Sequence, residues 1–581
     1  STRSPRRQFL RRSALAGAGL AAAVAVACRS SNDTSGGARQ PAASAVPQKA
    51  EAVSALIGRS GAPATGEQPA RGGIYNQLLS ANPPTLDPHG TTSVTTAQTV
   101  GGVYSRLMRF SAVQDVAEGN NKNIEPDLAL SAESAEGQTW VIKLRQNATF
   151  HSVPPVNGHA VEAEDVKATF TRAQSPTSAQ RSNLGMIDPD QIETPDRHTV
   201  VFKLRSPYAP FPKILASGSY GWIMPREVLS SYDPAKQIIG SGPFILEDFT
   251  RDVGATYKRN PEWFEQGRPY VDGAKLAIVP DPAQRLAQFS AGNLDAVGVP
   301  LDDLETMQAQ NPKAEVISNW DPGDGHIYFQ LGESNSPFQD IRLRQAVSLA
   351  IDRETYGRVT LNDQWIQGFN VAQTLGKWAL KIDDLPADTA QWYTFDLPRA
   401  KQLMTEAGGS NLQIQLLKPS PYPRDPWMQT VAEMIASMLG QLPWKVTLTL
   451  IDYNRDWVGG GKGVRYGNYP ADAIVWGGLE GRNEVDEYLF GFWHSKSTTN
   501  QARLNDPMVD AMIDKARAVL DEEERVKAYL DVQKYLASKV YSGTGNPNGL
   551  TKTMVNPRVH NYTLGDNYGV GTALWANAWL K

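Results

Sequence analysis

Cysteine is almost absent from this chain of 581 residues, in which Cys28 is the only one. A single thiol excludes an intrachain disulfide and any metal site built from several cysteines. Histidine is also scarce: seven residues are scattered along the sequence, with no pair at the spacing of a helical metal site. Neither H-E-x-x-H nor G-x-S-x-G occurs. The sequence therefore offers no recognisable metalloprotease or serine hydrolase motif.

Positive charge is in short supply beyond the N-terminal segment. Residues 1–27 contain five arginines and no acidic residue, which leaves 52 Lys and Arg against 61 Asp and Glu in the rest of the chain. An acidic body argues against nucleic acid binding, which needs clustered positive charge. It also argues against adhesion of the folded surface to anionic lipid. A hydrophobic content of 41% and a charged content of 20% are ordinary for a globular protein.

Long apolar runs are also missing, apart from one near the N-terminus. That run covers residues 13–27, consists mostly of Ala, Gly and Val, and follows an arginine-rich segment. It is too short to span a membrane comfortably, and its layout is typical of an export signal. No later stretch approaches eighteen apolar residues, so no transmembrane helix is predicted after it.

Two short motifs in this segment indicate an export route. Arg6 and Arg7 stand in R-R-Q-F-L-R, which resembles the twin-arginine motif. A-V-A-C, ending at Cys28, resembles a lipobox, whose cysteine carries a lipid. Lipoboxes usually have a larger aliphatic residue where this chain has Ala25, so an incidental cysteine in a cleaved signal is the alternative. We predict a twin-arginine lipoprotein-type signal over residues 1–28.

The following segment, residues 29–70, is rich in Ser, Ala, Gly, Gln and Pro and has little to bury. This composition predicts a flexible tether. A lipid on Cys28 would anchor the folded body to the outer face of the cytoplasmic membrane or hold it in the periplasm.

Strand patterns and helix patterns alternate through the rest of the chain. Residues 139–144 form a strand-like run, and residues 445–451 show the alternation of apolar and polar residues that is typical of strands. Residues 343–351 carry apolar side chains at i, i+3, i+4, i+7 and i+8, the stripe of an amphipathic helix. This mixture predicts an α/β protein, and the chain length predicts more than one domain.

A series of short motifs follows the same order along this chain as in one protein family. They include R-G-G-I at 71–74, N-P-P-T-L-D-P-H at 82–89, P-V-N-G and A-E-D-V within 155–166, G-S-G-P-F at 240–244, R-N-P-E-W-F at 259–264 and P-F-Q-D-I-R-L-R-Q-A at 337–346. Together they cover about residues 71–560 and resemble the family 5 extracellular solute-binding proteins of bacterial ABC transporters. This family includes dipeptide- and oligopeptide-binding proteins.

The resemblance implies a two-lobed, periplasmic-binding-protein-like (type II) α/β fold with a hinge and a larger lobe that has an extra subdomain. The boundaries expected from it are 71–115 for the first part of lobe I, 116–215 for the extra subdomain, 216–324 for the second part of lobe I, 325–545 for lobe II and 546–581 for the return to lobe I.

The function implied is that of an extracytoplasmic receptor, not an enzyme. It would capture a peptide-like solute between its lobes and deliver it to the permease and ATPase subunits of an ABC importer. An oligosaccharide is the alternative solute, and a secreted hydrolase is a more distant alternative. We expect a monomer without catalytic residues, cofactor, metal ion or nucleic acid partner.

The resemblance also indicates where the solute binds. Trp476, Gly477 and Gly478 end the run A-I-V-W-G-G, which resembles the family strand whose end borders the pocket. In peptide-binding relatives, an aspartate three residues after the tryptophan pairs with the α-ammonium group of the ligand. This chain has Leu479 there, followed by Glu480, so Glu480 is the nearest candidate for that role.

Three further aromatic residues are candidates for the solute pocket. Eight of the fourteen tryptophans lie between residues 360 and 500. Tryptophan packs on apolar groups, peptide planes and sugar faces alike, and simple core filling is the alternative for each. Trp365, Trp427 and Tyr453 are chosen because they lie in loops near regions that border the cleft in relatives.

Overall fold

The structure is a computed structural model, and it describes residues 68–581 apart from some short gaps. The predicted signal, with Arg6, Arg7 and Cys28, and all but the last three residues of the predicted tether lie outside the described residues, as does Glu480. The gaps are residue 92, residues 111–123, 219–220, 321–324, 363–364, 421–426, 460–461 and 479–481, residue 483, and residues 543–546 and 563–574.

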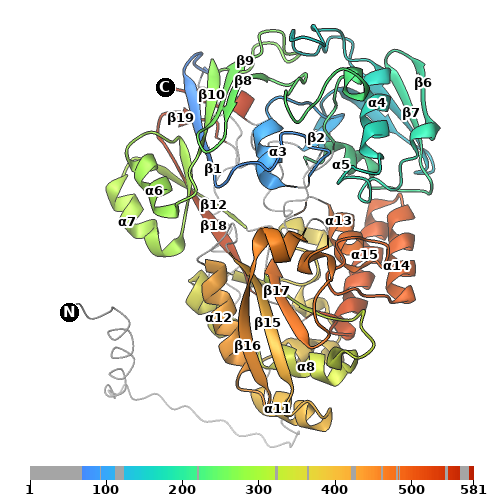
Figure 1. Ribbon diagram of the computed structural model, residues 1–581, viewed down its shortest axis with the longest axis vertical. Helices are drawn as coiled ribbons and strands as arrows, with labels where there is room; N and C mark the ends of the chain where they lie inside the picture. The colour runs from blue at the N-terminus through green and yellow to red at the C-terminus, as the bar shows by residue number, and fades with distance from the viewer. Residues whose placement is uncertain are drawn as a thin grey trace, which may run out of the picture. The chain divides into compact units, whose positions relative to one another are not determined.

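One mixed sheet contains the first strand of the described chain, and its four strands come from distant parts of the sequence. Its order is β1 (Ile74–Leu79), β10 (Gly273–Ile278), β9 (Gly254–Arg259) and β8 (Phe244–Thr250) (Figure 1). β1 is parallel to β10, whereas the other pairs are antiparallel. Tyr75 and Leu79 of β1 point into the core that this sheet shares with its neighbours.

A second sheet is antiparallel throughout and has the order β4 (Ala129–Glu133), β5 (Thr139–Leu144), β7 (Thr199–Lys203) and β6 (Ile192–Asp196). β5 confirms the strand predicted over residues 139–144. Helix α4 (Ala163–Ala173) packs on β6 and β7. Its first turn holds Glu164 and Asp165, and the Asp165 carboxylate accepts a hydrogen bond from the backbone N–H of Glu162 at 2.8 Å. This contact caps the positive end of the helix.

A third sheet is built from the second half of the chain, in the order β13 (Gly325–Phe329), β17 (Ala473–Gly478), β15 (Gln413–Ser420) and β16 (Lys445–Asp452). β15 runs parallel to β16 and β17, and β13 is antiparallel to β17. The central strands are largely buried, as parallel strands covered on both faces usually are. β16 confirms the strand predicted over residues 445–451.

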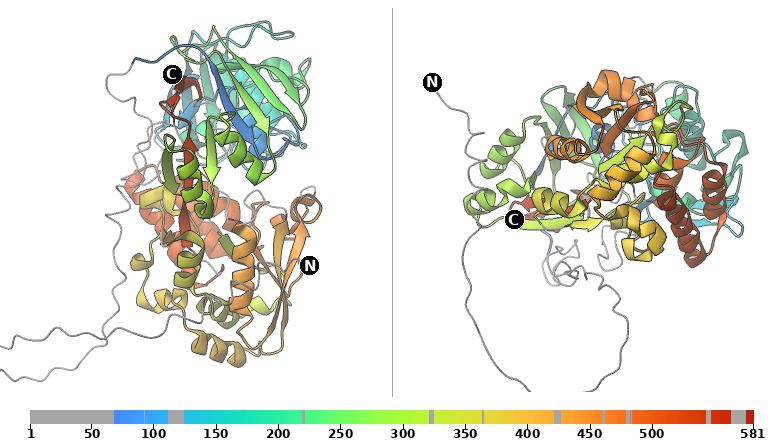
Figure 2. Two further views of the ribbon diagram at one scale, coloured as in Figure 1. Left: turned by 90° about the vertical axis from the view of Figure 1, so that its left-hand side faces the viewer. Right: turned by 90° about the horizontal axis from the view of Figure 1, so that it is seen from below.

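Helices cover both faces of this third sheet (Figures 1 and 2). Ile474 and Trp476 of β17 share a buried cluster with α8 (Ile341–Leu349) and α12 (Trp427–Leu439). The alternate residues Ala473 and Val475 share another cluster with α13 (Val485–Trp493), α14 (Pro507–Ala518) and α15 (Glu522–Ser538). The period of two along a strand explains this division. α8 confirms the predicted helix, although it ends two residues before Ile351.

One long strand, β18 (Pro547–Val555), pairs with strands from both halves of the chain. Its residues 550–555 pair antiparallel with β12 (Glu315–Trp320), and residues 552–555 pair on the other side with β11 (Ala296–Val299). Its first three residues instead pair with β14 (Trp365–Gln367). β18 therefore connects the two halves by backbone hydrogen bonds.

The remaining elements are short or peripheral. They are α3 (Val94–Val100), β2 (Met108–Phe110), β3 (Ile124–Pro126), α5 (Phe211–Ala216), α6 (Pro282–Ser290), α7 (Leu304–Gln310), α9 (Arg353–Leu361), α10 (Ala387–Ala390), α11 (Leu397–Glu406), β19 (Val559–His560), β20 (Trp579–Leu580) and several 3-10 turns. Within the part of the chain that the structure describes, no helix has both the length and the apolar character needed to cross a membrane.

The buried apolar side chains fall into two groups of clusters. One group draws on residues 75–317 and 554–578, and the other on residues 327–537. Among the described residues, no cluster mixes side chains of the two groups. Each half therefore has its own core, and two bodies need separate cores if each is to move as a unit.

Candidate functional site

Three of the predicted solute-binding residues lie at the end of β17, in the third sheet. Trp476, Gly477 and Gly478 are its last three residues, and they stand opposite residues 327, 326 and 325 of β13. Because two glycines of β17 lie beside Gly325 of β13, the strand end has no side chains of its own, and neighbouring rings can pack directly on its backbone.

Two tryptophan rings pack against these glycines, one on each face of the sheet. A Cβ atom added to Gly325 would lie 2.6 Å from Cζ2 of Trp476. A Cβ atom added to Gly477 would lie 2.8 Å from Cη2 of Trp457. Trp476 belongs to the cluster beneath α8 and α12, and Trp457 to the cluster beneath α13, α14 and α15. Glycine is therefore needed at both positions, because any side chain would displace a ring.

Both rings are buried with an unused hydrogen-bond donor. Trp476 is 0% exposed and Trp457 is 2% exposed, and neither indole Nε1 has an acceptor among the described residues. A buried indole N–H usually has a partner, and an unmet donor costs free energy. The side-chain oxygen of Gln501 lies 3.6 Å from the Cβ position of Gly477 and has no donor. The strand end thus has one unmatched donor on the face of Trp476, and one unmatched donor and one unmatched acceptor on the face of Trp457.

His326 adds an uncharged ring to this site. It is fully buried opposite Gly477, and burial lowers its pKa to about 3. The imidazole is therefore neutral at neutral pH. Its ring centroid lies 5.7 Å from that of Tyr328, which in turn lies 5.9 Å from that of Trp493. A row of aromatic rings therefore supports the strand end from β13 and α13.

The other predicted site residues lie in different places. Tyr453 begins the short helix η8 (Tyr453–Val458), which follows β16 and also carries Trp457, so it lies on the same side of the sheet as that ring. Trp365 lies in β14, which pairs with β18 and not with the third sheet. Its indole packs on Gly357 of α9. The backbone of Trp427 begins α12, and its side chain lies outside the described structure.

Sequence reasoning did not select Trp457, Gln501 or His326. Trp457 follows Tyr453 by four residues, and one turn of a short helix places both beside the sheet. That spacing was the available signal. His326 reaches the site through strand pairing, and Gln501 through a loop. Both residues are distant from Trp476 in the sequence, and no local pattern marks them.

A separate polar cluster connects the two halves of the chain. The buried carboxylate of Asp486 in α13 accepts hydrogen bonds from the hydroxyl groups of Tyr208, at 2.7 Å, and Tyr529, at 3.1 Å. It also forms an ion pair with Nε of Arg517 at 3.1 Å. Tyr208 precedes α5, whereas the other three residues belong to the second half.

Two further contacts extend this junction. Lys213 of α5 forms an ion pair with Glu484 at 2.8 Å, and the Glu484 side chain is 2% exposed. The backbone N–H of Ala209 donates to the carbonyl of Arg517 at 2.8 Å. An ion pair and hydrogen bonds therefore connect residues 208–213 with α13 and α14.

Comparison with known proteins agrees with this architecture. The chain resembles the "Probable D,D-dipeptide-binding periplasmic protein DdpA" of Escherichia coli (strain K12), with 27% identity over 478 residues, 78% of this chain and 84% of that protein. It also resembles "Di/tripeptide-binding protein 2" of Pseudomonas aeruginosa (strain UCBPP-PA14), with 26% identity over 73% of this chain and 81% of that protein.

Solved structures show the same fold. The periplasmic binding protein DppA from Helicobacter pylori, in complex with peptide STSA, superposes with a TM-score of 0.72 at 19% identity, covering 88% of this chain and 98% of that one. AgaA of Agrobacterium tumefaciens R10, in complex with agropinic acid, gives a TM-score of 0.71 at 24% identity, covering 88% of this chain and 99% of that one. The expected two-lobed binding-protein fold is therefore confirmed.

The family itself is identified by a match over residues 123–500 to the group described as "Bacterial extracellular solute-binding proteins, family 5 Middle". This segment includes β17 and most of the second half of the chain, as well as α4 and its cap. The chain belongs to the family 5 bacterial extracellular solute-binding proteins.

Proposed function

We propose that this chain is the solute receptor of an ABC importer and that its solute is a short peptide. The relatives named above are a D,D-dipeptide-binding protein and a di/tripeptide-binding protein, each similar over more than two thirds of its length. Membership of the solute-binding family supports a receptor that captures its solute and passes it on chemically unchanged. Oligosaccharide, the alternative solute, gains no support from these relatives.

The observation that carries the peptide assignment is the chemistry of the β17 end. Two buried indole N–H groups, of Trp476 and Trp457, lack acceptors, and the amide oxygen of Gln501 lacks a donor. A peptide bond supplies a carbonyl acceptor and an N–H donor together. Gly478 ends the strand without a side chain, which would let an extended peptide approach the backbone there. The predicted residues Trp476, Gly477, Gly478, Glu480 and Tyr453 form part of this proposal.

The proposed mechanism is closure of two lobes over the peptide. Lobe II would comprise residues 325–545, and lobe I the flanking segments, in agreement with the division of the buried clusters. β18 would form the hinge, because its backbone pairs with β12 of the first half and with β14 of the second half. Contacts such as Tyr208 to Asp486 would stabilise the closed form, which the permease recognises.

Export and anchoring complete the proposal. Arg6 and Arg7 would direct the chain through the twin-arginine route, and a lipid on Cys28 would hold it outside the cytoplasmic membrane. Residues 29–70 would act as the tether. The receptor would function as a monomer beside the permease and ATPase subunits.

Equilibrium binding measured by calorimetry tests the proposal. Purified protein is titrated with di- and tripeptides, and in parallel with agropinic acid and with short oligosaccharides. We expect a peptide to bind and to raise the free energy of unfolding by about 2.7 kcal/mol at a hundredfold excess over Kd. Binding of an oligosaccharide alone, or hydrolysis of the peptide detected by mass spectrometry, would contradict the proposal.

A further inference from the structure

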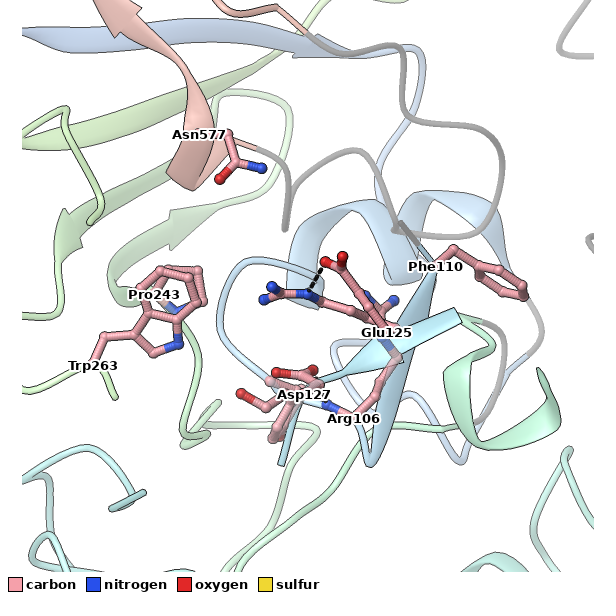
Figure 3. Close-up of a pocket in the computed structure, with 10 residues that line it drawn as sticks. Arg106, Phe110, Glu125, Asp127, Pro243, Trp263 and Asn577 are labelled. Atoms are coloured by element: carbon pink, nitrogen blue, oxygen red, sulfur yellow. Dashed lines mark hydrogen bonds and ion pairs between the residues drawn. The ribbon is translucent and has the colours of Figure 1, made fainter. Parts of the chain in front are cut away.

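Two groups of charged side chains in the first half of the chain differ in their net charge. One lies between β2 and β3, where Figure 3 shows the ion pair that Glu125 forms with Arg109, at 2.7 Å. Two arginines, Arg106 and Arg109, meet two carboxylates there, those of Glu125 and Asp127, so the charges balance. The other group lies at the N-terminal end of α4, where the charges do not balance.

Three side chains with atoms that can ligate a metal converge at the N-terminal end of α4. They are His159 in the preceding loop, Asp165 in the first turn of the helix and Glu227 in the 3-10 turn η2 (Arg226–Leu229), and their ligand atoms all lie within 4.8 Å of one another. The side chain of Asp165 is 0% exposed, whereas those of His159 and Glu227 are 24% and 23% exposed. Solvent therefore reaches the group at His159 and Glu227.

The imidazole of His159 directs a lone pair at the carboxylate of Glu227. Its Nδ1 atom lies 2.9 Å from the carbonyl oxygen of Ala160, which can only accept a hydrogen bond, so Nδ1 carries the ring proton. In the neutral ring, Nε2 then has a lone pair, and it lies 3.1 Å from a carboxylate oxygen that also offers only lone pairs. This contact is repulsive unless a proton or a metal ion lies between the two atoms. A histidine that ligates a metal usually donates its other ring N–H to a carbonyl or carboxylate group in the same way.

Neighbouring contacts hold the imidazole in this orientation. The ring of Phe150 meets it edge to face, with 5.0 Å between the ring centroids. The backbone N–H of Phe150 donates to the carbonyl of His159 at 3.0 Å, and Thr149 forms a β-bridge with Ala160. The backbone on which the ring stands is therefore fixed.

Negative charge predominates around the histidine. Glu162, the N-cap residue of α4, adds a third carboxylate. Among the described residues, the arginines paired with these carboxylates are Arg226, at 3.2 Å from Glu162 and 3.4 Å from Asp165, and Arg197, at 3.5 Å from Glu162. With His159 neutral, three carboxylates face two guanidinium groups, which leaves a net charge of −1. Since the side chain of Arg197 is 81% exposed, its pairing compensates little of the negative charge.

Asp165 can ligate a metal without giving up its role as a helix cap. Its Oδ2 atom accepts from the backbone N–H of Glu162 at 2.8 Å, and Oδ1 accepts from the backbone N–H of Arg226 at 3.0 Å. An ionised carboxylate has about four lone-pair positions. These contacts and the Arg226 guanidinium leave a lone pair of Oδ2 for a metal ion, and the two backbone N–H groups hold the carboxylate in place.

We propose that His159, Asp165 and Glu227 bind one zinc ion, with water as the fourth ligand. One imidazole nitrogen with two carboxylate oxygens is a donor set that zinc accepts, whereas magnesium and calcium prefer oxygen ligands alone. Tetrahedral zinc with bonds of about 2.0–2.2 Å holds its ligand atoms about 3.3–3.6 Å apart, and the spacing between the His159 nitrogen and the Glu227 oxygen is 3.1 Å. A proton would join only this pair of atoms, whereas a zinc ion accounts for the convergence of all three side chains.

The zinc ion joins three segments of the first half: the loop before α4, the first turn of α4 and η2. Because these residues are separate in the sequence, no local motif marks the site. None of the three ligands lies in residues 325–545, so zinc binds independently of the transported peptide. Failure of the zinc site would therefore leave the proposed function intact.

Isothermal titration calorimetry with zinc chloride tests the site. The protein carries Cys28→Ser, so that its one thiol cannot bind zinc, and it is freed of metal with a chelator. We expect one zinc ion to bind at pH 7, and magnesium and calcium chloride to give no such binding. His159→Gln and Glu227→Gln should each weaken zinc binding by at least about tenfold. The control His198→Gln, between β6 and β7, should bind zinc as the parent does.

A second measurement locates the ion directly. Crystals soaked in zinc chloride should show anomalous density between His159, Asp165 and Glu227, and this result stands even if a variant fails to fold. Unchanged zinc affinity in H159Q, or anomalous density only elsewhere, would overturn the proposal. Absence of zinc binding at pH 7 would also overturn it, and would mean that the His159 nitrogen holds only a proton.

Discussion

At the scale of single residues, the two unpaired indole donors are the most specific feature of the proposed peptide site. We expect Trp476→Phe and Trp457→Phe each to weaken peptide binding about tenfold, because phenylalanine keeps an aromatic ring but loses the N–H donor. Calorimetric titration measures the change. Trp444→Phe is the matched control, since that indole already donates to the carbonyl of Leu439 at 2.7 Å. It should lower stability by about 1 kcal/mol and leave peptide affinity unchanged. Equal affinity in all three variants would remove the indoles from the site.

Phenylalanine is a better test than alanine because Trp476 is completely buried. Truncating a buried tryptophan to alanine leaves a cavity and costs about 3–5 kcal/mol of stability. A loss of binding in such a variant would not separate contact with the peptide from damage to the fold. Conversion to phenylalanine changes the hydrogen bonding more than the packing.

The position of Trp476 could be predicted from the sequence, but its surroundings could not. The run A-I-V-W-G-G places the residue at a strand end by resemblance to the family. The ring packs over Gly325, about 150 residues earlier in the chain, and that contact arises from antiparallel pairing between β13 and β17. Local patterns carry no information about which distant strands pair, so Trp457, His326 and Gln501 were not selected.

At the scale of secondary-structure elements, the junction between α5 and α13 is open to test. We expect Tyr208→Phe to weaken peptide binding severalfold without touching the β17 end, because it removes the hydroxyl that donates to Asp486 across the proposed lobe boundary. Calorimetry gives the affinity, and small-angle X-ray scattering with saturating peptide gives the degree of closure. Tyr535→Phe is the control, since its hydroxyl donates to Asp506 within the second half. If Tyr208→Phe and Tyr535→Phe bound peptide equally well, the hydrogen bond between Tyr208 and Asp486 would have no part in closure.

The same element makes a strong prediction about stability. Asp486→Asn leaves Arg517, which is largely buried, with only the exposed carboxylate of Asp514 at 3.9 Å, so we expect a loss of about 3 kcal/mol in the free energy of unfolding. Urea denaturation measures this loss. Asp302→Asn, at an exposed position, should change stability by less than about 0.5 kcal/mol. A small loss of stability in Asp486→Asn would mean that water reaches the polar cluster around Asp486.

Elements themselves were easier to predict than their arrangement. A strand-like run located β5, alternation of apolar and polar residues located β16, and the helical stripe located α8, because each pattern depends only on near neighbours. The strand order β13-β17-β15-β16 and the pairing of β18 with three strands depend on contacts across long stretches of chain. Those contacts are set by the packing of whole faces, which only the family resemblance could anticipate.

At the scale of the whole molecule, anchoring to the membrane gives a further prediction. Cys28→Ser removes the thiol that a lipid would modify, so we expect the exported protein to move from the membrane fraction to the soluble fraction of cells. Immunoblots of fractionated cells measure the distribution. Because residue 28 precedes the proposed tether, peptide affinity should be unchanged. Retention of the variant on membranes would contradict the lipid anchor.

The stability of the whole molecule should fall steeply in mild acid because several histidines are buried in their neutral form. Burial lowers the pKa of His89 and His326 to about 3 and that of His151 to about 4, and Arg172 contributes to the shift at His89. In the unfolded chain these side chains titrate near 6.5.

Between the two pKa values the unfolded state binds more protons than the folded state, so protonation favours unfolding. The contribution of each histidine is complete above about pH 6.5 and decreases by up to about 1.4 kcal/mol per pH unit as the pH falls toward its folded-state pKa. Urea denaturation at pH 7, 6 and 5 measures this slope. His89→Leu should reduce the slope by about 1.4 kcal/mol per pH unit between pH 6 and 5, because one buried titrating group is gone and buried acids such as Asp165 are unchanged. An equal slope in the variant and the wild type would mean that water or a hydrogen-bond partner reaches the imidazole of His89 and lets it protonate in the folded state.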